Sequence, residues 1–180
     1  MTDVERASVT SLLAESRDAL HALVDGLTDA QWHAPPRPEA WSPIEVLDHL
    51  AITERAVLVL LTERLPKRPP APPDRRSTVD DEKLVRITED RGQGLEAPDR
   101  MRPQGSTTSL AELLAAFDAD RAVLLRYAES TTDDLRARLA PHPIAGPIDA
   151  YQWLLFLGAH TRRHIAQIAE GPRLRLDAGK

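Results

Sequence analysis

The sequence predicts an all-α protein in which four helices of about 20 residues each pack as a four-helix bundle. The 15 prolines gather in clusters and leave four long stretches without proline. Apolar residues recur in these stretches at helical spacings. Strand signals are weak, because no run alternates β-branched with polar residues. The 180 residues are the length of one domain, which we place at 1–172, with a C-terminal tail at 173–180.

The first expected helix spans 3–27. Thr2 and Glu5 form a capping box at its start, and Gly26 lies near its end. The second expected helix, 43–65, begins with Ser42 as N-cap, Pro43 at its first position and Glu45 at its third. Pro66 ends this helix. The first helix has one apolar stripe, formed by Val9, Leu12, Leu13, Leu20, Leu23, Val24 and Leu27.

The third expected helix, 110–129, starts with a capping box formed by Ser109 and Glu112. The fourth, 148–170, ends at Gly171-Pro172. The inner face of the third helix comprises Leu110, Leu113, Leu114, Phe117, Arg121, Leu124 and Leu125.

The connections between these helices differ in length. Segments 28–41 and 130–147 are polar and rich in proline, with room for a short helical turn. The 66–108 crossover between the second and third helices is longer, contains seven prolines and has a short periodic patch at 79–88. We expect a short helix there, and a connection this long is usually functional.

Composition and charge exclude several classes of function. The chain has no cysteine, so disulfides, thiolate nucleophiles and cysteine-ligated metals are excluded. Its net charge of −5 argues against a nucleic-acid partner. No apolar run approaches the length of a membrane span, and the first residues do not form a signal peptide. We therefore expect a cytoplasmic protein.

Two of the six histidines, His160 and His164, lie four residues apart in the last expected helix. Both rings then project from one helical face, which Phe156 and Gln167 continue, and they can converge on one ion. His49, on the second helix, is predicted to point inward as well. Bundles build metal sites from facing helices. The pattern also fits a partly buried His49 bonded to a backbone carbonyl.

The other histidines have simpler interpretations. We expect His21 at the surface and His33 in a structural turn, whereas His142, between two prolines, either supports its loop or approaches the mouth of a site. The tryptophans are not interleaved with basic residues, which argues for core anchors rather than a base-stacking platform. They are Trp32, Trp41 and Trp153.

Several of these motifs together resemble a DinB-like (DNA-damage-inducible) domain. In the first half the resemblance lies in residues 26–32 and in the Trp-Ser-Pro…His-Leu element of 41–51. In the second half it lies in 141–148 and in the His-x-x-Arg-His-x-x-Gln element within 159–168. It covers about residues 5–170, and the 66–108 segment carries no part of it.

The resemblance implies an up-up-down-down bundle, often a homodimer, with one divalent metal held by three histidines. Mapped onto this chain, the ligands are His49, His160 and His164. The resemblance implies that this metal is nickel or zinc, the common metals of the family, with iron or manganese as the less common ones. Relatives often carry an acidic residue directly after the first histidine of the helical pair, whereas this chain has Thr161.

The resemblance also implies a metal-dependent thiol S-transferase or a hydrolase acting on a small molecule. Because the chain lacks cysteine, a thiolate must come from a low-molecular-weight thiol such as bacillithiol, mycothiol or glutathione. We expect substrate choice to lie in the 66–108 and 141–147 segments. The alternative is a non-catalytic, stress-associated dimeric binding module with a structural metal or none.

Three charged residues near the expected ligands have competing interpretations. Arg163 either contacts an anionic cofactor group, or makes a salt bridge or faces solvent. Glu45 and Asp48 are candidates for orienting an imidazole. Glu45 also fits the third position of its capping box.

Overall fold

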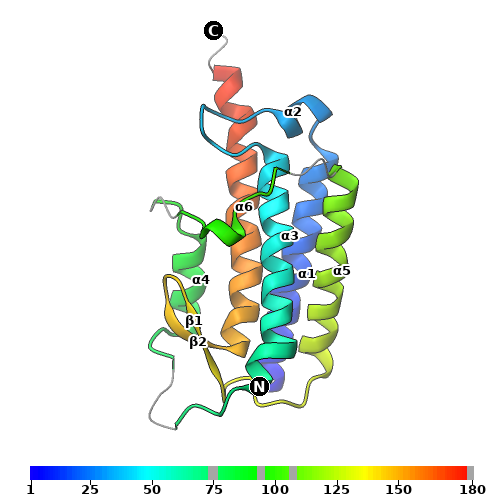
Figure 1. The fold of residues 1–180 in the computed structure, drawn as a ribbon. Coiled ribbons are helices and arrows are strands. Elements are labelled where there is room, and N and C mark those ends of the chain that lie inside the picture. The colour runs from blue at the N-terminus through cyan, green and yellow to red at the C-terminus, as the bar shows by residue number, and fades with distance from the viewer. Residues whose placement is uncertain (73–76, 93–95, 106–108, 178–180) are drawn as a thin grey trace.

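A computed structural model describes residues 1–72, 77–92, 96–105 and 109–177, with side chains to residue 170. Within these ranges, four long helices form the bundle (Figure 1): α1 (Asp3–Asp25), α3 (Pro43–Val59), α5 (Leu110–Ser130) and α6 (Ala150–Asp177). Helices α1 and α3 each pack against both α5 and α6. The predicted four-helix bundle is confirmed.

The helix directions differ from those that the resemblance implies. Helices α1 and α6 run one way, and α3 and α5 run the other way (Figure 1). One apolar cluster accordingly joins Leu20 late in α1, Leu47 early in α3, Leu113 early in α5 and Ile168 late in α6. The 26–42 connection, which includes α2 (Asp29–His33), stays where α1 ends, so α3 must run back from there. The order is up-down-down-up, and the implied up-up-down-down order is wrong.

Capping boxes start three of the long helices in the described chain, as the sequence predicts. In each box the backbone N–H of the N-cap residue donates to a glutamate three positions later, which satisfies a group that the helix itself leaves free. The pairs are Thr2–Glu5 at 2.7 Å, Ser42–Glu45 at 2.7 Å and Ser109–Glu112 at 2.9 Å.

Two helix ends differ from the prediction. Helix α3 passes into a π-helical turn, Leu60–Arg64, and a 3₁₀ turn, Leu65–Lys67, so the helical path continues beyond Pro66. Helix α6 continues through Gly171 and Pro172 to Asp177, and the predicted tail at 173–180 begins as helix. A proline costs one hydrogen bond in a helix, but its φ of about −65° is itself helical, so it does not force an end.

The crossover carries two short helices along the side of the bundle. Helix α4 (Asp81–Glu89) packs along α6, and the turn η3 (Asp99–Met101) contacts α3. Asp80 caps α4 by accepting from the backbone N–H of Lys83 at 2.6 Å. The crossover therefore brings backbone from outside the bundle to the middle of α3.

Strands β1 (Leu139–His142) and β2 (Gly146–Asp149) form an antiparallel hairpin, which the weak strand signals of the sequence do not reveal. Each strand contains a proline, Pro141 in β1 and Pro147 in β2, and a proline weakens the strand signal of a sequence. The two prolines face each other in the register, so both missing N–H groups fall at one rung that needs no hydrogen bonds. Gly146, with φ of 70°, closes the turn in a conformation that favours glycine.

The described core consists of two apolar clusters, one around Leu47 and Phe117 near α2, and one around Leu13 and Leu154 nearer the hairpin. Between them lies a set of polar side chains that we call the polar layer. It comprises Ser16, His49, Glu54, Arg121, His160, Thr161 and His164. In the described residues, no helix combines the length and apolar character needed to cross a membrane.

Candidate metal centre

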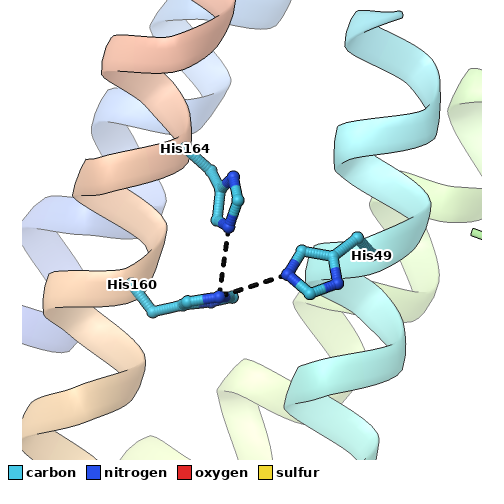
Figure 2. A group of neighbouring side chains, drawn as sticks. All are labelled: His49, His160 and His164. Atoms are coloured by element: carbon cyan, nitrogen blue, oxygen red, sulfur yellow. Dashed lines mark hydrogen bonds between the residues drawn. The ribbon is translucent and has the colours of Figure 1, made fainter. Parts of the chain in front are cut away.

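The three predicted ligands meet inside the bundle. His49 extends from α3 toward His160 and His164 on α6 (Figure 2). The Nε2 atom of His160 lies 3.2 Å from Nε2 of His49 and 3.1 Å from Nε2 of His164. One ligand atom from each ring lies within 4.8 Å of those of the other two. The spacing of four residues on α6 thus does what the sequence predicts, because it stacks two rings on one face.

The separation of these nitrogens fits a shared transition metal. Zinc binds histidine nitrogen at about 2.0–2.1 Å, and tetrahedral geometry then separates two ligand nitrogens by about 3.3–3.4 Å. The two Nε2 separations at His160 are close to that value. Both pairs that include His160 are therefore already near ligand spacing.

Hydrogen bonds on the far side of two rings orient them toward the centre. His49 Nδ1 donates to the Met101 carbonyl oxygen at 2.6 Å, and His164 Nδ1 donates to Gln167 Oε1 at 2.9 Å. A carbonyl oxygen can only accept, so each Nδ1 carries the proton and each Nε2 keeps its lone pair. Such acceptors are the usual partners of metal-binding histidines, because they set the tautomer and the ring orientation.

Burial keeps the three imidazoles neutral. It lowers the pKa of His49, against the opposing effect of the hydrogen bond to Met101. It lowers the pKa of His164 to about 3, and His49 adds to that shift. The pKa of His160 lies well below its ordinary value because of burial and the two neighbouring histidines. At neutral pH protons therefore do not compete with a metal for these nitrogens.

Aromatic rings enclose the centre on two sides. The Trp41 ring lies 5.2 Å from that of His49, and the Phe156 ring lies 4.9 Å from that of His160, both between centroids. These walls limit water and lower the local dielectric, which strengthens electrostatic interactions inside the site.

Comparison with known proteins identifies the family of this chain. A family model described as the DinB superfamily matches residues 12–168. The chain belongs to the DinB superfamily. It is also 28% identical over 160 residues to YuaE of Bacillus subtilis (strain 168), named as an uncharacterized protein, with 89% of this chain and 94% of YuaE covered.

Two solved structures share the fold of this DinB superfamily member. TT2238, described as a four-helix bundle protein, superposes with a TM-score of 0.60 at 24% identity, over 92% of this chain and 98% of its own. YfiT from Bacillus subtilis superposes with a TM-score of 0.62 at 22% identity, over 98% and 90%. YfiT is described as a probable metal-dependent hydrolase with an unusual four-helix bundle topology.

The charged residues near the ligands have other partners. Glu45 accepts from Ser42 in the capping box. Asp48 accepts from the backbone N–H of Gln104 at 2.9 Å and so holds the crossover against α3. Arg163 donates through Nη1 to the Asp90 carbonyl, a contact that joins α6 to the end of α4. None of these contacts involves an imidazole of the centre.

Thr161, where relatives often carry an acid, lies on a different side of α6 from its neighbour His160. Its hydroxyl donates to the Leu157 carbonyl and accepts from Arg121 at 3.0 Å. The position belongs to the packing of the bundle, and the three-histidine set is complete without it.

The remaining histidines do not belong to the ligand set. His21, part-exposed, pairs with Asp118 at 2.9 Å, and His33 contacts the Asp29 carbonyl within α2. His142 is 5% exposed and lies at the end of β1. The sequence analysis included a backbone carbonyl as a partner of His49 but could not identify it as that of Met101, since the contact joins residues 52 positions apart. Gln167 had a visible signal, because it continues the ligand face of α6.

Proposed function

We propose that this chain binds one divalent transition metal through Nε2 of His49, His160 and His164 and acts as a metal-dependent hydrolase on a small molecule. The observation that carries the proposal is the convergence of three neutral imidazoles from two helices, two of them oriented by hydrogen bonds to Met101 and Gln167. The description of YfiT as a probable metal-dependent hydrolase supports the same reading at the level of fold.

The donor set suits this role. Three imidazoles without a fourth described protein ligand leave a coordination position for a reactant, as in catalytic zinc sites, whereas structural zinc sites are closed by four ligands. When bound, such an ion supplies a Lewis acid that activates water and polarises a substrate oxygen. Imidazole nitrogens suit zinc and nickel first, and iron or manganese bind them more weakly.

The residues of the chain itself have separate tasks in this proposal. Met101 and Gln167 hold the two outer rings in the tautomer that presents Nε2. Trp41 and Phe156 exclude bulk water from the centre. With no cysteine in the sequence, a thiol S-transfer reaction would need a small-molecule thiol as a second substrate.

Elemental analysis of the untagged protein, after incubation with zinc and dialysis, tests the proposal. We expect about one zinc per chain, as three convergent ligands imply, and loss of that zinc in His49→Ala, His160→Ala and His164→Ala. His21→Ala is the matched control, because this histidine pairs with Asp118 outside the centre. Full zinc uptake by any of the three ligand variants contradicts the ligand set.

Zinc-loaded protein is then assayed against a panel of small esters, amides and lactones, with and without added low-molecular-weight thiols. Hydrolysis that needs zinc but no thiol supports the hydrolase. Turnover only in the presence of a thiol replaces it with the S-transferase.

A further inference from the structure

His142, at the tip of the hairpin, has one ring nitrogen in use and one without a partner. Its Nδ1 accepts from the backbone N–H groups of Ile144 at 3.3 Å and Ala145 at 3.1 Å. An imidazole nitrogen that accepts carries no proton, so the proton of the neutral ring is on Nε2. Burial lowers the pKa of His142 to about 4, which keeps the ring neutral at pH 7. His142 Nε2 is therefore a hydrogen-bond donor.

Beside His142 Nε2 lies a second buried donor without an acceptor in the described chain, the indole N–H of Trp153. Trp153 lies with its ring centroid 5.1 Å from that of His142. Both side chains are more than nine-tenths buried, at 5% and 8% exposed. Neither His142 Nε2 nor Trp153 Nε1 has an acceptor among the residues that the structure describes. A buried N–H without an acceptor is rare in folded proteins, because the hydrogen bond it makes to water in the unfolded chain is not replaced, so two in contacting rings call for an explanation.

The pair lies next to the candidate metal centre. The Phe156 ring contacts His142 at 4.6 Å and His160 at 4.9 Å between centroids, and so bridges the two. Trp153, Phe156 and His160 follow one another at spacings of three and four, which places them on one face of α6. His142 is also close enough to His160 to contribute to lowering its pKa.

The chemistry of the pair selects its ligand. Both groups are neutral donors in an apolar wall, so they match an oxygen that only accepts, such as a carbonyl or carboxylate oxygen. Trp32 Nε1 is also buried without a described acceptor. It lies in the other apolar cluster, around Leu47 and Phe117, and offers a matched control.

We propose that His142 Nε2–H and Trp153 Nε1–H form a substrate-binding subsite that accepts a carbonyl or carboxylate oxygen beside His160. The subsite rests on the proposed function, because it positions a substrate whose reacting group lies at the three histidines. The hairpin then contributes to specificity, because the backbone N–H groups of its own turn fix the His142 tautomer that carries its proton on Nε2.

Nitrogen-15 labelling of the tryptophans tests this subsite, since the chain has three indole N–H groups. The probe is succinic acid monohydroxamate, whose hydroxamate binds zinc and whose carboxylate extends away from it. We expect the Trp153 indole resonance of the zinc-loaded protein to move on titration, with the Trp32 resonance unmoved. Trp153→Phe and Trp32→Phe assign the two signals.

Affinity gives the second readout. The matched probe is 4-methylpentanohydroxamate, which replaces the carboxylate by an isopropyl group of similar shape. The parent protein should prefer the carboxylate probe, and Trp153→Phe should lose about three- to tenfold of that preference, as expected for one hydrogen bond. His142→Asn should do the same, because an asparagine oxygen can still accept from the turn while the Nε2 donor is lost. Trp32→Phe should keep the full preference.

The possible failures are distinct. If the protein takes up no zinc, the proposed function fails and the subsite fails with it. If zinc and both probes bind but the Trp153 resonance and the preference stay unchanged, the subsite alone is wrong, and the two donors bond to buried water. Circular dichroism confirms that each variant is folded before its affinity is interpreted.

Discussion

Two groups of buried polar side chains share the polar layer, and they differ in how their hydrogen-bonding capacity is used. Arg121 on α5 contacts all the other long helices of the described bundle. Its five N–H donors reach both carboxylate oxygens of Glu54 on α3, the Leu13 carbonyl and the Ser16 hydroxyl on α1, and the Thr161 hydroxyl on α6. In the histidine cluster, the Nε2 lone pairs of His49 and His164 instead both point at Nε2 of His160.

The difference indicates which cluster is structural and which is functional. Arg121 and Glu54 are fully buried, and each satisfies the other. Burial raises the pKa of Glu54, and the Arg121 guanidinium opposes that shift. All five N–H donors of Arg121 are used within this cluster. The histidine cluster is neutral, and under the proposed function a cation binds the Nε2 lone pairs that point into it.

Breaking the Arg121 cluster should have the largest effect on stability. Arg121→Met leaves Glu54 buried without its partner, which should cost about 3–5 kcal/mol of unfolding free energy. Urea unfolding followed by circular dichroism measures the loss. The double variant Arg121→Met with Glu54→Leu should recover much of it, because no charge then remains buried. A loss below about 1 kcal/mol in the single variant would show that the two clusters do not differ as described.

Removing the acceptor of His164 should weaken the histidine cluster without unfolding the protein. Gln167→Leu removes the acceptor to which His164 Nδ1–H donates. The variant should bind zinc about 10- to 100-fold more weakly, which is the usual effect of losing such a partner. Gln167→Glu keeps an acceptor and should stay close to the parent. Competition with a zinc-binding dye measures both constants. Equal zinc affinity in the parent, Gln167→Leu and Gln167→Glu would show that Gln167 does not orient His164 for the metal.

A substitution at Thr161 tests whether the two clusters are independent, because Thr161 follows His160 in the sequence but bonds to Arg121. Thr161→Val leaves one buried Arg121 donor unsatisfied and should cost about 1–3 kcal/mol. Zinc affinity should stay within a factor of about three, under 1 kcal/mol. A stability unchanged from the parent, or a large fall in zinc affinity, would show that the clusters are not separate.

The smallest effect is expected at an ion pair near the end of the bundle. Glu5 accepts from Arg136 at 2.7 Å, and this hydrogen bond lowers the pKa of Glu5. A carboxyl whose pKa is lower in the folded state stabilises the protein above its unfolded pKa of about 4.3 and loses that effect as pH falls through the folded pKa. Glu5→Gln should therefore cost less than about 1 kcal/mol at pH 7.

Urea unfolding at pH 7 and pH 3, each at low and high salt, measures this pair. The difference from the parent should shrink with added salt and at pH 3. A difference that instead grows at pH 3 would reverse the assigned sign. Unlike this pair, the buried Arg121 cluster should be nearly insensitive to salt.

Local sequence signals predicted the helices and much of the candidate site. The capping boxes at Thr2, Ser42 and Ser109 mark helix starts through contacts within three residues, so no tertiary information is needed. The convergence of His160 and His164 follows from helical spacing alone. The inner face that the sequence assigns to Arg121 is also confirmed by its burial.

Tertiary contacts could not be predicted in this way. Met101 orients His49 from 52 residues away, and Glu54 pairs with Arg121 across 67. The hairpin was missed because Pro141 and Pro147 weaken each strand pattern separately, and only their pairing removes the cost. The up-down-down-up order depends on where the connections lie, which local periodicity does not encode.

The central claim is that the histidine cluster is a metal site within an otherwise closed polar layer. Urea unfolding with zinc at about 100 times its dissociation constant tests it directly in the parent and in His160→Ala. We expect zinc to raise the free energy of unfolding of the parent by about 2.7 kcal/mol and to leave that of His160→Ala unchanged. An equal zinc-dependent gain in both proteins would contradict the claim.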